Sequence, residues 1–275
     1  MSEEKETLGL IAGGGQFPLL VARAGKEQGL RVVAVAHRGE TDSSLEHYVD
    51  EIVWIKLGQL GRLIKALNKA GAEKALMAGS ITKKRMFENI QPDLKGLAVA
   101  SKLAFLHDDG ILRAVSEELA RKGIEVVSCA SYLPELLAPP GCLTLRRPEN
   151  AEKTDIRFGW KIAKELGRLD VGQSVVVRRK TVLALEAIDG TDETILRGGK
   201  LARKKAVVVK VSKPGQDLRF DLPSVGLETL HVMSRVKATV LAVETGKTLM
   251  FNRAEMIEYA DKEGISIISY EDRQI

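Results

Sequence analysis

Three consecutive glycines, Gly13 to Gly15, separate a short apolar run from a helical pattern that begins at Pro18. Glycine allows backbone N–H groups to approach a phosphate closely, and the dipole at the start of a helix favours an anion. Pro18 stands where the third glycine of a G-x-G-x-x-G fingerprint belongs, so a tight turn without a ligand is the alternative. The residues that we predict to bind a phosphate or nucleotide are Gly13, Gly14, Gly15 and Gln16.

A second polar loop leaves the carboxyl end of another apolar run, Lys74 to Ala78. It begins at Gly79, offers the hydroxyl groups of Ser80 and Thr82, and continues into three consecutive basic residues. The carboxyl ends of parallel strands share one edge of a sheet, where ligands usually bind. We therefore expect this loop and the glycines to line the same crevice, with a solvated basic loop as the alternative.

Carboxylates gather at two further places. Asp108 and Asp109 precede a helical pattern, where one of them can cap the helix and the other can hold a metal or a sugar hydroxyl. Glu186, Asp189 and Asp192 follow a strand pattern and offer the hard oxygen ligands that Mg²⁺ takes. Asp-Gly is also ordinary turn chemistry, which is the alternative for this second group.

Residues 213–229 form a long stretch that mixes charges with proline and glycine. Long irregular segments inside compact domains are usually functional. Asp221 lies two residues before Pro223 in this stretch, and Arg219 lies close by. A charged surface loop without function is the alternative.

The N-terminal half repeats one order of predicted elements around these residues: a helix, then a glycine, then an apolar strand. Gly29, Gly71 and Gly123 end helical patterns, and a continuous apolar run begins within a few residues of each. Continuous apolar runs between helices indicate buried parallel strands. We predict an α/β protein whose N-terminal part is an open parallel Rossmann-like sheet.

The repeated order of helix, glycine and strand ends at the segment 133–150, which holds four of the eight prolines of the chain. The region after it begins with a helix and then changes to a period of two, including a hairpin across Arg179-Lys180. We predict a C-terminal α+β domain with a mixed sheet. The expected domains are a nucleotide- or phosphate-binding domain over 1–132, a linker over 133–150 and a catalytic domain over 151–275.

Composition narrows the class of protein. The 275 residues are 44% hydrophobic and 29% charged, which suits a globular chain with an aliphatic core, since aromatics are only 4%. A net charge of +5 favours an anionic partner, but the basic residues are spread out and we expect no nucleic-acid binding. Two cysteines, no export signal and no apolar run of about 20 residues predict a cytoplasmic protein. The zinc, Walker and G-x-S-x-G motifs are absent from the sequence.

Taken together in order, five stretches resemble the LpxI-type UDP-2,3-diacylglucosamine pyrophosphatases of lipid A biosynthesis. They are 11–18, 78–82, 108–113, 169–177 with 186–192, and 213–229. The resemblance implies two domains with the active site between them and Mg²⁺-dependent hydrolysis of the UDP-sugar pyrophosphate to UMP and 2,3-diacylglucosamine 1-phosphate. The essential aspartate of the family falls in its Asp-Leu-Pro element, which is Asp221 here.

With that resemblance, the chemistry can be assigned to residues. Asp221 is the expected catalytic residue, as a general base or as a metal ligand with Asp192 and Glu186. The expected substrate-binding residues are Gly13, Gly14, Gly15, Gln16, Ser80, Thr82, Asp108, Asp109, Thr191 and Arg219. The lipid substrate predicts peripheral contact with the inner membrane surface, and a homo-oligomer is left open. Two other functions stay open: an NADP-dependent oxidoreductase that uses Arg38, and a non-catalytic nucleotide-sugar-binding protein.

Overall fold

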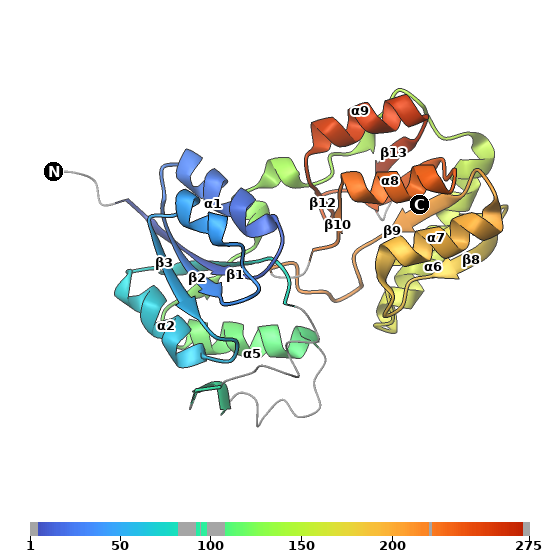
Figure 1. Ribbon diagram of the computed structural model, residues 1–275. Coiled ribbons are helices and arrows are strands. Elements are labelled where there is room, and N and C mark those ends of the chain that lie inside the picture. The colour runs from blue at the N-terminus through green and yellow to red at the C-terminus, as the bar shows by residue number, and fades with distance from the viewer. Residues whose placement is uncertain (1–4, 82–91, 94, 98–107, 220–221, 272–275) are drawn as a thin grey trace. The chain divides into compact units, whose positions relative to one another are not determined.

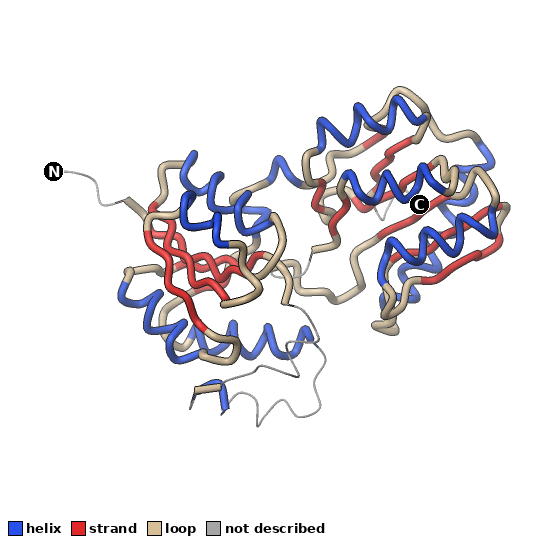
Figure 2. The backbone as a smooth tube through the Cα atoms, viewed as in Figure 1, coloured by secondary structure: helices blue, strands red, loops and turns tan. Residues whose placement is uncertain are grey.

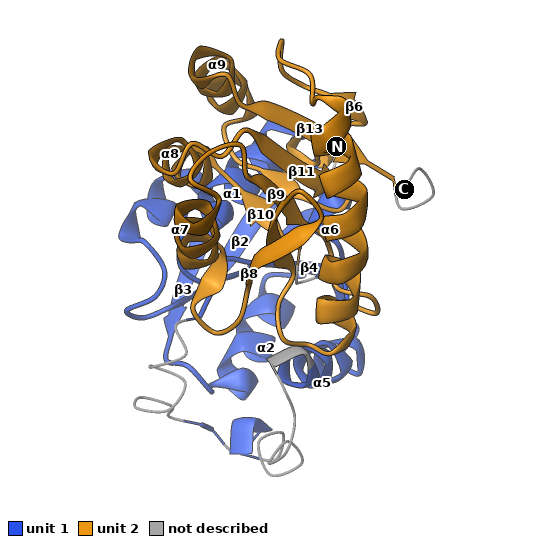
Figure 3. Ribbon diagram, turned by 90° about the vertical axis from the view of Figure 1, so that its right-hand side faces the viewer, with its two compact units in different colours: residues 1–133, 217–221 blue, residues 134–216, 222–275 orange. Residues whose placement is uncertain are grey.

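A computed structural model of the chain describes residues 5–81, 92–93, 95–97, 108–219 and 222–271 (Figure 1). These residues fall into two compact units, shown in separate colours in Figure 3. Unit 1 contains the residues up to Leu133 together with 217–219, and unit 2 contains Pro134–Gln216 and the residues from Leu222 onward. The backbone therefore leaves unit 2 after Gln216, contributes a short segment to unit 1, and returns.

Unit 1 is built on an all-parallel sheet of five strands in the order β3-β2-β1-β4-β5. The strands are β1 (Thr7–Ala12), β2 (Arg31–His37), β3 (Glu51–Ile55), β4 (Lys74–Ala78) and β5 (Glu125–Val126). This order confirms the predicted open parallel sheet, and it reverses direction between β1 and β4. The sequence did not reveal β3, an edge strand that is only half-buried over most of its length.

Helices cover both faces of this sheet (Figure 2). Helix α1 (Phe17–Glu27) packs on one face, whereas α2 (Leu60–Lys69) and α5 (Asp108–Ala120) lie on the other. Helix α2 presents an apolar stripe at a spacing of three or four residues, and every member of the stripe is buried: Leu60, Leu63, Ile64 and Leu67. A short 3₁₀ helix, η1 (Ser43–Tyr48), packs against α1.

Unit 2 contains a mixed sheet, as predicted, and its six strands have the order β6-β13-β11-β9-β7-β8. The strands β9, β11 and β13 are parallel to one another, whereas β7 is antiparallel to both β8 and β9. The bounds are β6 (Gly141–Cys142), β7 (Ser174–Arg178), β8 (Thr181–Leu185), β9 (Val207–Lys210), β11 (Val240–Glu244) and β13 (Ser266–Tyr270). Two short strands, β10 (Ser224–Val225) and β12 (Leu249–Met250), form a separate parallel pair.

Successive residues along a strand of the second sheet point to opposite faces, and each face packs in its own hydrophobic core. Helix α6 (Asn150–Arg168) covers one face, where Trp160 packs with Val175 and Val177. The other face, which includes Val176, is covered by α7 (Gly190–Ala202), α8 (Leu227–Arg235) and α9 (Arg253–Glu263). The period of two along β7 thus serves both layers.

The sequence analysis did not predict helices α7 and α8, and it assigned only their first residues to a turn and to the irregular stretch 213–229. Gly198 and Gly199 interrupt α7 with residues of poor helix propensity, which concealed the helix. A Cβ atom at Gly198 would lie 2.5 Å from Cβ of Val176, and one at Gly199 would lie 2.2 Å from a methyl of Val236. The two glycines are therefore explained by close packing of α7 on β7 and beside α8.

The segment 133–150, predicted as a linker, folds largely with unit 2. From Pro134 onward it belongs to that unit, and it contributes β6, which pairs antiparallel with β13. Arg146 at its end makes a bidentate ion pair with the buried Glu152 of α6. The proline-rich segment therefore forms an edge of the sheet of unit 2.

The hairpin between β7 and β8 turns at Arg179 and Lys180, as predicted. Both residues have left-handed φ values, 51° and 55°. The carboxylate of Asp155, on α6, accepts a hydrogen bond from each of their N–H groups, at 2.8 and 2.7 Å. A buried side chain from a distant helix therefore stabilises a turn whose own residues do not favour it.

No helix among the described residues is both long enough and apolar enough to cross a bilayer.

Replacing Asp155 with alanine removes both acceptors from this turn, and we expect the free energy of unfolding to fall by about 1–3 kcal/mol. Urea unfolding measures the change. Glu165→Ala is the control on the same helix, because Glu165 makes only an exposed pair with Arg168 and should cost less than about 1 kcal/mol. Equal losses for the two variants would contradict the role assigned to Asp155.

Candidate active site

The loops that follow β1 and β4 pair through their backbones at the point where the strand order of unit 1 reverses. Gly13 donates its N–H to the carbonyl of Ala78 at 2.8 Å. Gly14 and Ser80 exchange two hydrogen bonds, at 2.7 and 3.1 Å, in an antiparallel bridge. The structure thus brings together the two loops that the sequence analysis placed at one crevice.

Glycine is required at this contact because there is no room for side chains. A Cβ atom at Gly13 would lie 2.6 Å from the carbonyl oxygen of Ser80. Gly79 has a φ of +89°, and a Cβ there would lie 2.5 Å from the carbonyl oxygen of Gly14. Close backbone approach therefore explains glycines on both loops independently of any ligand.

This pairing determines which backbone N–H groups are left to bind a phosphate. The N–H of Gly14, one of the four residues that the sequence analysis assigned to the phosphate, is already bonded to Ser80. Gly15 and Gln16 are exposed, and Gln16 is the N-cap of α1 without a side-chain cap of its own. Their N–H groups therefore remain the better candidates at the start of this helix. Thr82, on the facing loop, lies outside the described residues.

A buried histidine ties the end of β2 to the glycine loop. The Nδ1 atom of His37 donates to the carbonyl of Ala12 at 2.9 Å, and the hydroxyl of Thr41 donates to the same oxygen at 2.7 Å. Thr41 in turn accepts a bond from the N–H of His37. Burial lowers the pKa of His37, so the ring is neutral at pH 7 and donates a hydrogen bond within the polar core.

The segment 217–219 is fixed to the same unit. Ser128, just after β5, donates its hydroxyl to the carbonyl of Leu218 at 3.0 Å, and Arg219 donates to the hydroxyl of Ser116 on α5 at 3.4 Å. The guanidinium of Arg219 also pairs with Asp217, at 2.7 Å. Hydrogen bonding from that guanidinium lowers the pKa of Asp217.

Besides Thr82, three predicted site residues have no described side chain. Asp221 lies outside the described residues. Asp108 and Asp109 open helix α5, and only their backbone is described. Their assignment to catalysis and substrate binding stays a prediction.

In unit 2 the structure gathers a second polar cluster. One oxygen of the buried Glu186 accepts a bond from the hydroxyl of Thr191 at 2.8 Å, and the other accepts one from the N–H of Gln173 at 3.2 Å. Lys210, the last residue of β9, donates to Thr191 at 3.0 Å and to the carbonyl of Ser224 at 2.8 Å. The sequence analysis did not identify Lys210. The one feature that marks Lys210 in the sequence is its charge at the end of a run of valines.

Asp192 belongs to the same cluster. Burial raises the pKa of Asp192, the ammonium of Lys210 opposes that rise, and the negative charges of Glu228 and Glu186 add to it. The negative charge of one predicted metal ligand, Glu186, thus acts on the other, Asp192.

The described residues do not by themselves form the predicted Mg²⁺ site. Both oxygens of Glu186 accept protein hydrogen bonds, and Lys210 brings a positive charge to the cluster. Throughout the part of the chain that the structure describes, no three histidine, cysteine or acidic side chains are grouped as metal ligands. The third predicted ligand, Asp221, lies outside that part.

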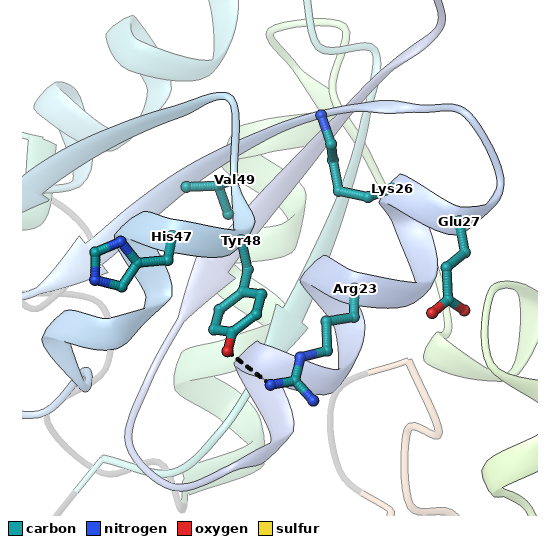
Figure 4. Close-up of a pocket in the computed structure, with 6 residues that line it drawn as sticks. All are labelled: Arg23, Lys26, Glu27, His47, Tyr48 and Val49. Carbon is teal, nitrogen blue, oxygen red and sulfur yellow. Dashed lines mark hydrogen bonds between the residues drawn. The ribbon is translucent and has the colours of Figure 1, made fainter.

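A hollow of about 440 Å³ lies elsewhere in unit 1, between the C-terminal half of α1 and the end of η1 (Figure 4). Arg23 donates to the hydroxyl of Tyr48 at 2.7 Å across it, and its guanidinium carbon lies 4.3 Å from the centre of the Tyr48 ring. Lys26 pairs with Asp50 beside it. None of the predicted site residues lines this hollow.

Comparison with known proteins gives matches over both halves of the chain. Residues 7–136 match the LpxI N-terminal domain family and residues 139–268 match the LpxI C-terminal domain family. The chain is similar to the UDP-2,3-diacylglucosamine pyrophosphatase LpxI of Caulobacter vibrioides, with 33% identity over 97% of this chain and 98% of the relative.

Solved structures give weaker similarities. A biotin carboxylase complex from Campylobacter jejuni is 15% identical with a TM-score of 0.29, over 71% of this chain and 42% of that chain. The biotin carboxylase domain of a 2-oxoglutarate carboxylase from Hydrogenobacter thermophilus is 17% identical with a TM-score of 0.27, over 65% of this chain and 36% of that chain.

The contact between the two glycine-containing loops can be tested with a pair of alanine variants. Gly79 and Gly71 both have positive φ, but a Cβ at Gly71 would meet nothing within 4 Å. Each alanine should cost about 1–2 kcal/mol for its backbone conformation, and only Gly79→Ala should cost more, because it pushes the loops apart. Urea unfolding compares them, and equal losses would contradict the close contact.

Proposed function

We propose that this chain, which belongs to the LpxI family, hydrolyses the pyrophosphate bond of UDP-2,3-diacylglucosamine. The observation that carries the proposal is the match of both family domains, together with a relative of that activity that is similar over nearly the whole chain. The chain is accordingly an enzyme, a phosphoanhydride hydrolase. Water adds to one phosphorus, the bridging P–O bond breaks, and the products are UMP and 2,3-diacylglucosamine 1-phosphate.

The chemistry requires neutralisation of charge and a positioned water. A pyrophosphate diester carries two negative charges that repel a nucleophile, so donors aimed at its oxygens lower the barrier. We assign the phosphates of the nucleotide to Gly15 and Gln16, whose N–H groups lie at the exposed start of α1. We assign the hydroxyl of Ser80 to the same ligand, because the backbone of Ser80 is paired with the glycine loop.

Asp221 is assigned the catalytic role, as a general base that takes the proton of the attacking water or as a metal ligand. Two residues before it, Arg219 is held by Ser116 and Asp217, so the chain that leads to Asp221 is fixed on unit 1. Arg219 is the proposed substrate-binding residue of this segment, and Asp217 accepts hydrogen bonds from its Nε and Nη2 atoms. The expectation that the active site lies between the two domains stays a prediction.

Dependence on Mg²⁺ is part of this proposal and rests on the family resemblance. If Asp221 is a ligand, Asp192 and Glu186 of unit 2 are the proposed further ligands, and each oxygen of Glu186 also accepts one protein hydrogen bond. When bound, the ion would neutralise charge on the pyrophosphate. The test is turnover of the UDP-sugar with EDTA and after Mg²⁺ is restored, with the products followed by mass spectrometry.

Asp221→Ala should lower kcat by at least about 100-fold, because positioned acid–base catalysis alone contributes that much. Binding of the UDP-sugar, measured by calorimetry, should persist, since the nucleotide contacts lie on the glycine loop. Added Mg²⁺ should restore part of the rate only if Asp221 is a ligand.

The control for this variant is Asp42→Ala, which removes the exposed cap of η1 and should leave kcat unchanged. A rate near that of the wild type for Asp221→Ala would remove Asp221 from the mechanism. Binding without turnover by the wild-type protein itself would instead favour the non-catalytic alternative.

We also propose peripheral contact with the cytoplasmic surface of the inner membrane, because the substrate is a lipid and the net charge is +5. Cosedimentation with anionic vesicles should decrease as salt is raised from about 50 to 500 mM, since the Debye length shortens several-fold over that range. Vesicles of neutral lipid are the control. Binding that is equal on both kinds of vesicle, or absent from the anionic ones at low salt, would contradict an electrostatic contact.

A further inference from the structure

A buried carboxylate holds the point at which the chain leaves unit 2 toward Asp221. Glu244, the last residue of β11, is fully buried and lies beside the end of β9. Its Oε2 atom accepts hydrogen bonds from the N–H of Ser212 at 2.9 Å and from the hydroxyl of Ser212 at 2.7 Å. Ser212 is the second residue after β9, where the irregular segment begins.

Two lysines keep this carboxylate ionised. Lys164, on α6, donates to Oε2 of Glu244 at 2.7 Å, and Lys247 donates to Oε1 at 2.8 Å. Burial alone would raise the pKa of Glu244, but the hydrogen bonds from Lys164, Lys247 and Ser212 outweigh it and lower the pKa. At neutral pH the residue is therefore charged, and its bonds to Ser212 are charge-assisted and strong.

The same ion pair holds Ser212 at every polar atom. Besides the two bonds to Glu244, the carbonyl of Ser212 accepts a bond from Lys164 at 3.3 Å. The next residue, Lys213, pairs with Asp170 at 2.7 Å, and its Cα would lie 3.0 Å from a Cβ at Gly167. The direction in which the chain departs from the sheet is thus determined before it reaches unit 1.

The part of the chain that returns to unit 2 is also attached by a buried charged residue. Lys210, at the end of the neighbouring strand β9, donates to the carbonyl of Ser224. Between these two attachments, Leu218 is bonded to Ser128 of unit 1. The described parts of the crossing segment are therefore anchored at its start, its middle and its end.

We propose that Glu244 is a positioning residue for hydrolysis, acting through Ser212 on the segment that leads to Asp221. This inference rests on the proposed function, which makes Asp221 the catalytic residue. Its physical reason is geometric: displacement of a catalytic group by about 1 Å can cost about 100-fold in rate. Glu244 lies at the root of the segment and need not touch substrate.

Glu244→Gln tests the proposal, and Glu152→Gln is its matched control. Glu152 is also a buried carboxylate of unit 2 that pairs with a cation, Arg146, and with a hydroxyl, but its hydrogen bonds go to Arg146, Glu149 and Thr239, outside the crossing segment. Both variants should lose stability in urea. Only Glu244→Gln should lower kcat per folded molecule, by about tenfold or more, with KM changed by less than about twofold.

Hydrogen–deuterium exchange gives a second measurement that does not depend on turnover. Amides of residues 211–219 should exchange faster in Glu244→Gln and at the wild-type rate in Glu152→Gln. Ser212→Ala keeps the ion pairs but removes the hydroxyl bond, and it should shift kcat and exchange in the same direction by less.

Equal kcat for the two glutamine variants, or unchanged exchange over 211–219 in Glu244→Gln, would overturn the proposal. A wild-type protein that does not turn over the UDP-sugar would overturn the proposed function and, with it, the catalytic role of this contact. The exchange experiment would still show whether Glu244 anchors the segment, so the two failures can be told apart.

Discussion

Backbone pairing between the loops after β1 and β4 is the contact on which the candidate nucleotide site depends. It joins the two strands between which the sheet order reverses, and it leaves no space for a side chain at Gly13 or Gly79. Because the pairing uses the N–H of Gly14, the proposal assigns the phosphate to the exposed start of α1. His37 and Thr41 extend the arrangement by holding the carbonyl of Ala12.

Unit 2 relies on a different constraint, the need to compensate charges that are buried at strand ends. Isolation of a carboxylate or an ammonium from water costs several kcal/mol unless partners replace the lost hydration. Glu244 is hydrogen-bonded to Ser212 and two lysines, and Lys210 is hydrogen-bonded to Thr191 and Ser224. Those partners lie on loops, so the same bonds that satisfy the charges also fix the loops.

In the proposed hydrolysis of a nucleotide-sugar pyrophosphate, we assign these two arrangements separate roles. Unit 1 supplies a backbone-lined edge and a helix start suited to phosphate, and unit 2 supplies buried charges that control where a polar segment begins and ends. The segment 217–219 belongs to the first unit although the chain around it folds in the second. Residues of the two units are thereby linked through the backbone of one short stretch.

Local patterns in the sequence determined the fold class, most of the elements and the glycine loops. Helix periodicity, glycine stops and valine runs depend on neighbours a few residues apart, so they can be recognised without a structure. The missed helix α7 shows the limit, because Gly198 and Gly199 look like a turn until Val176 and Val236 are seen against them. The ionised Glu244 and Ser212 are 32 residues apart in the chain, and no local pattern marks such a pair. Which polar residues anchor the segment before Asp221 was therefore decided only by the packing of β9 against β11.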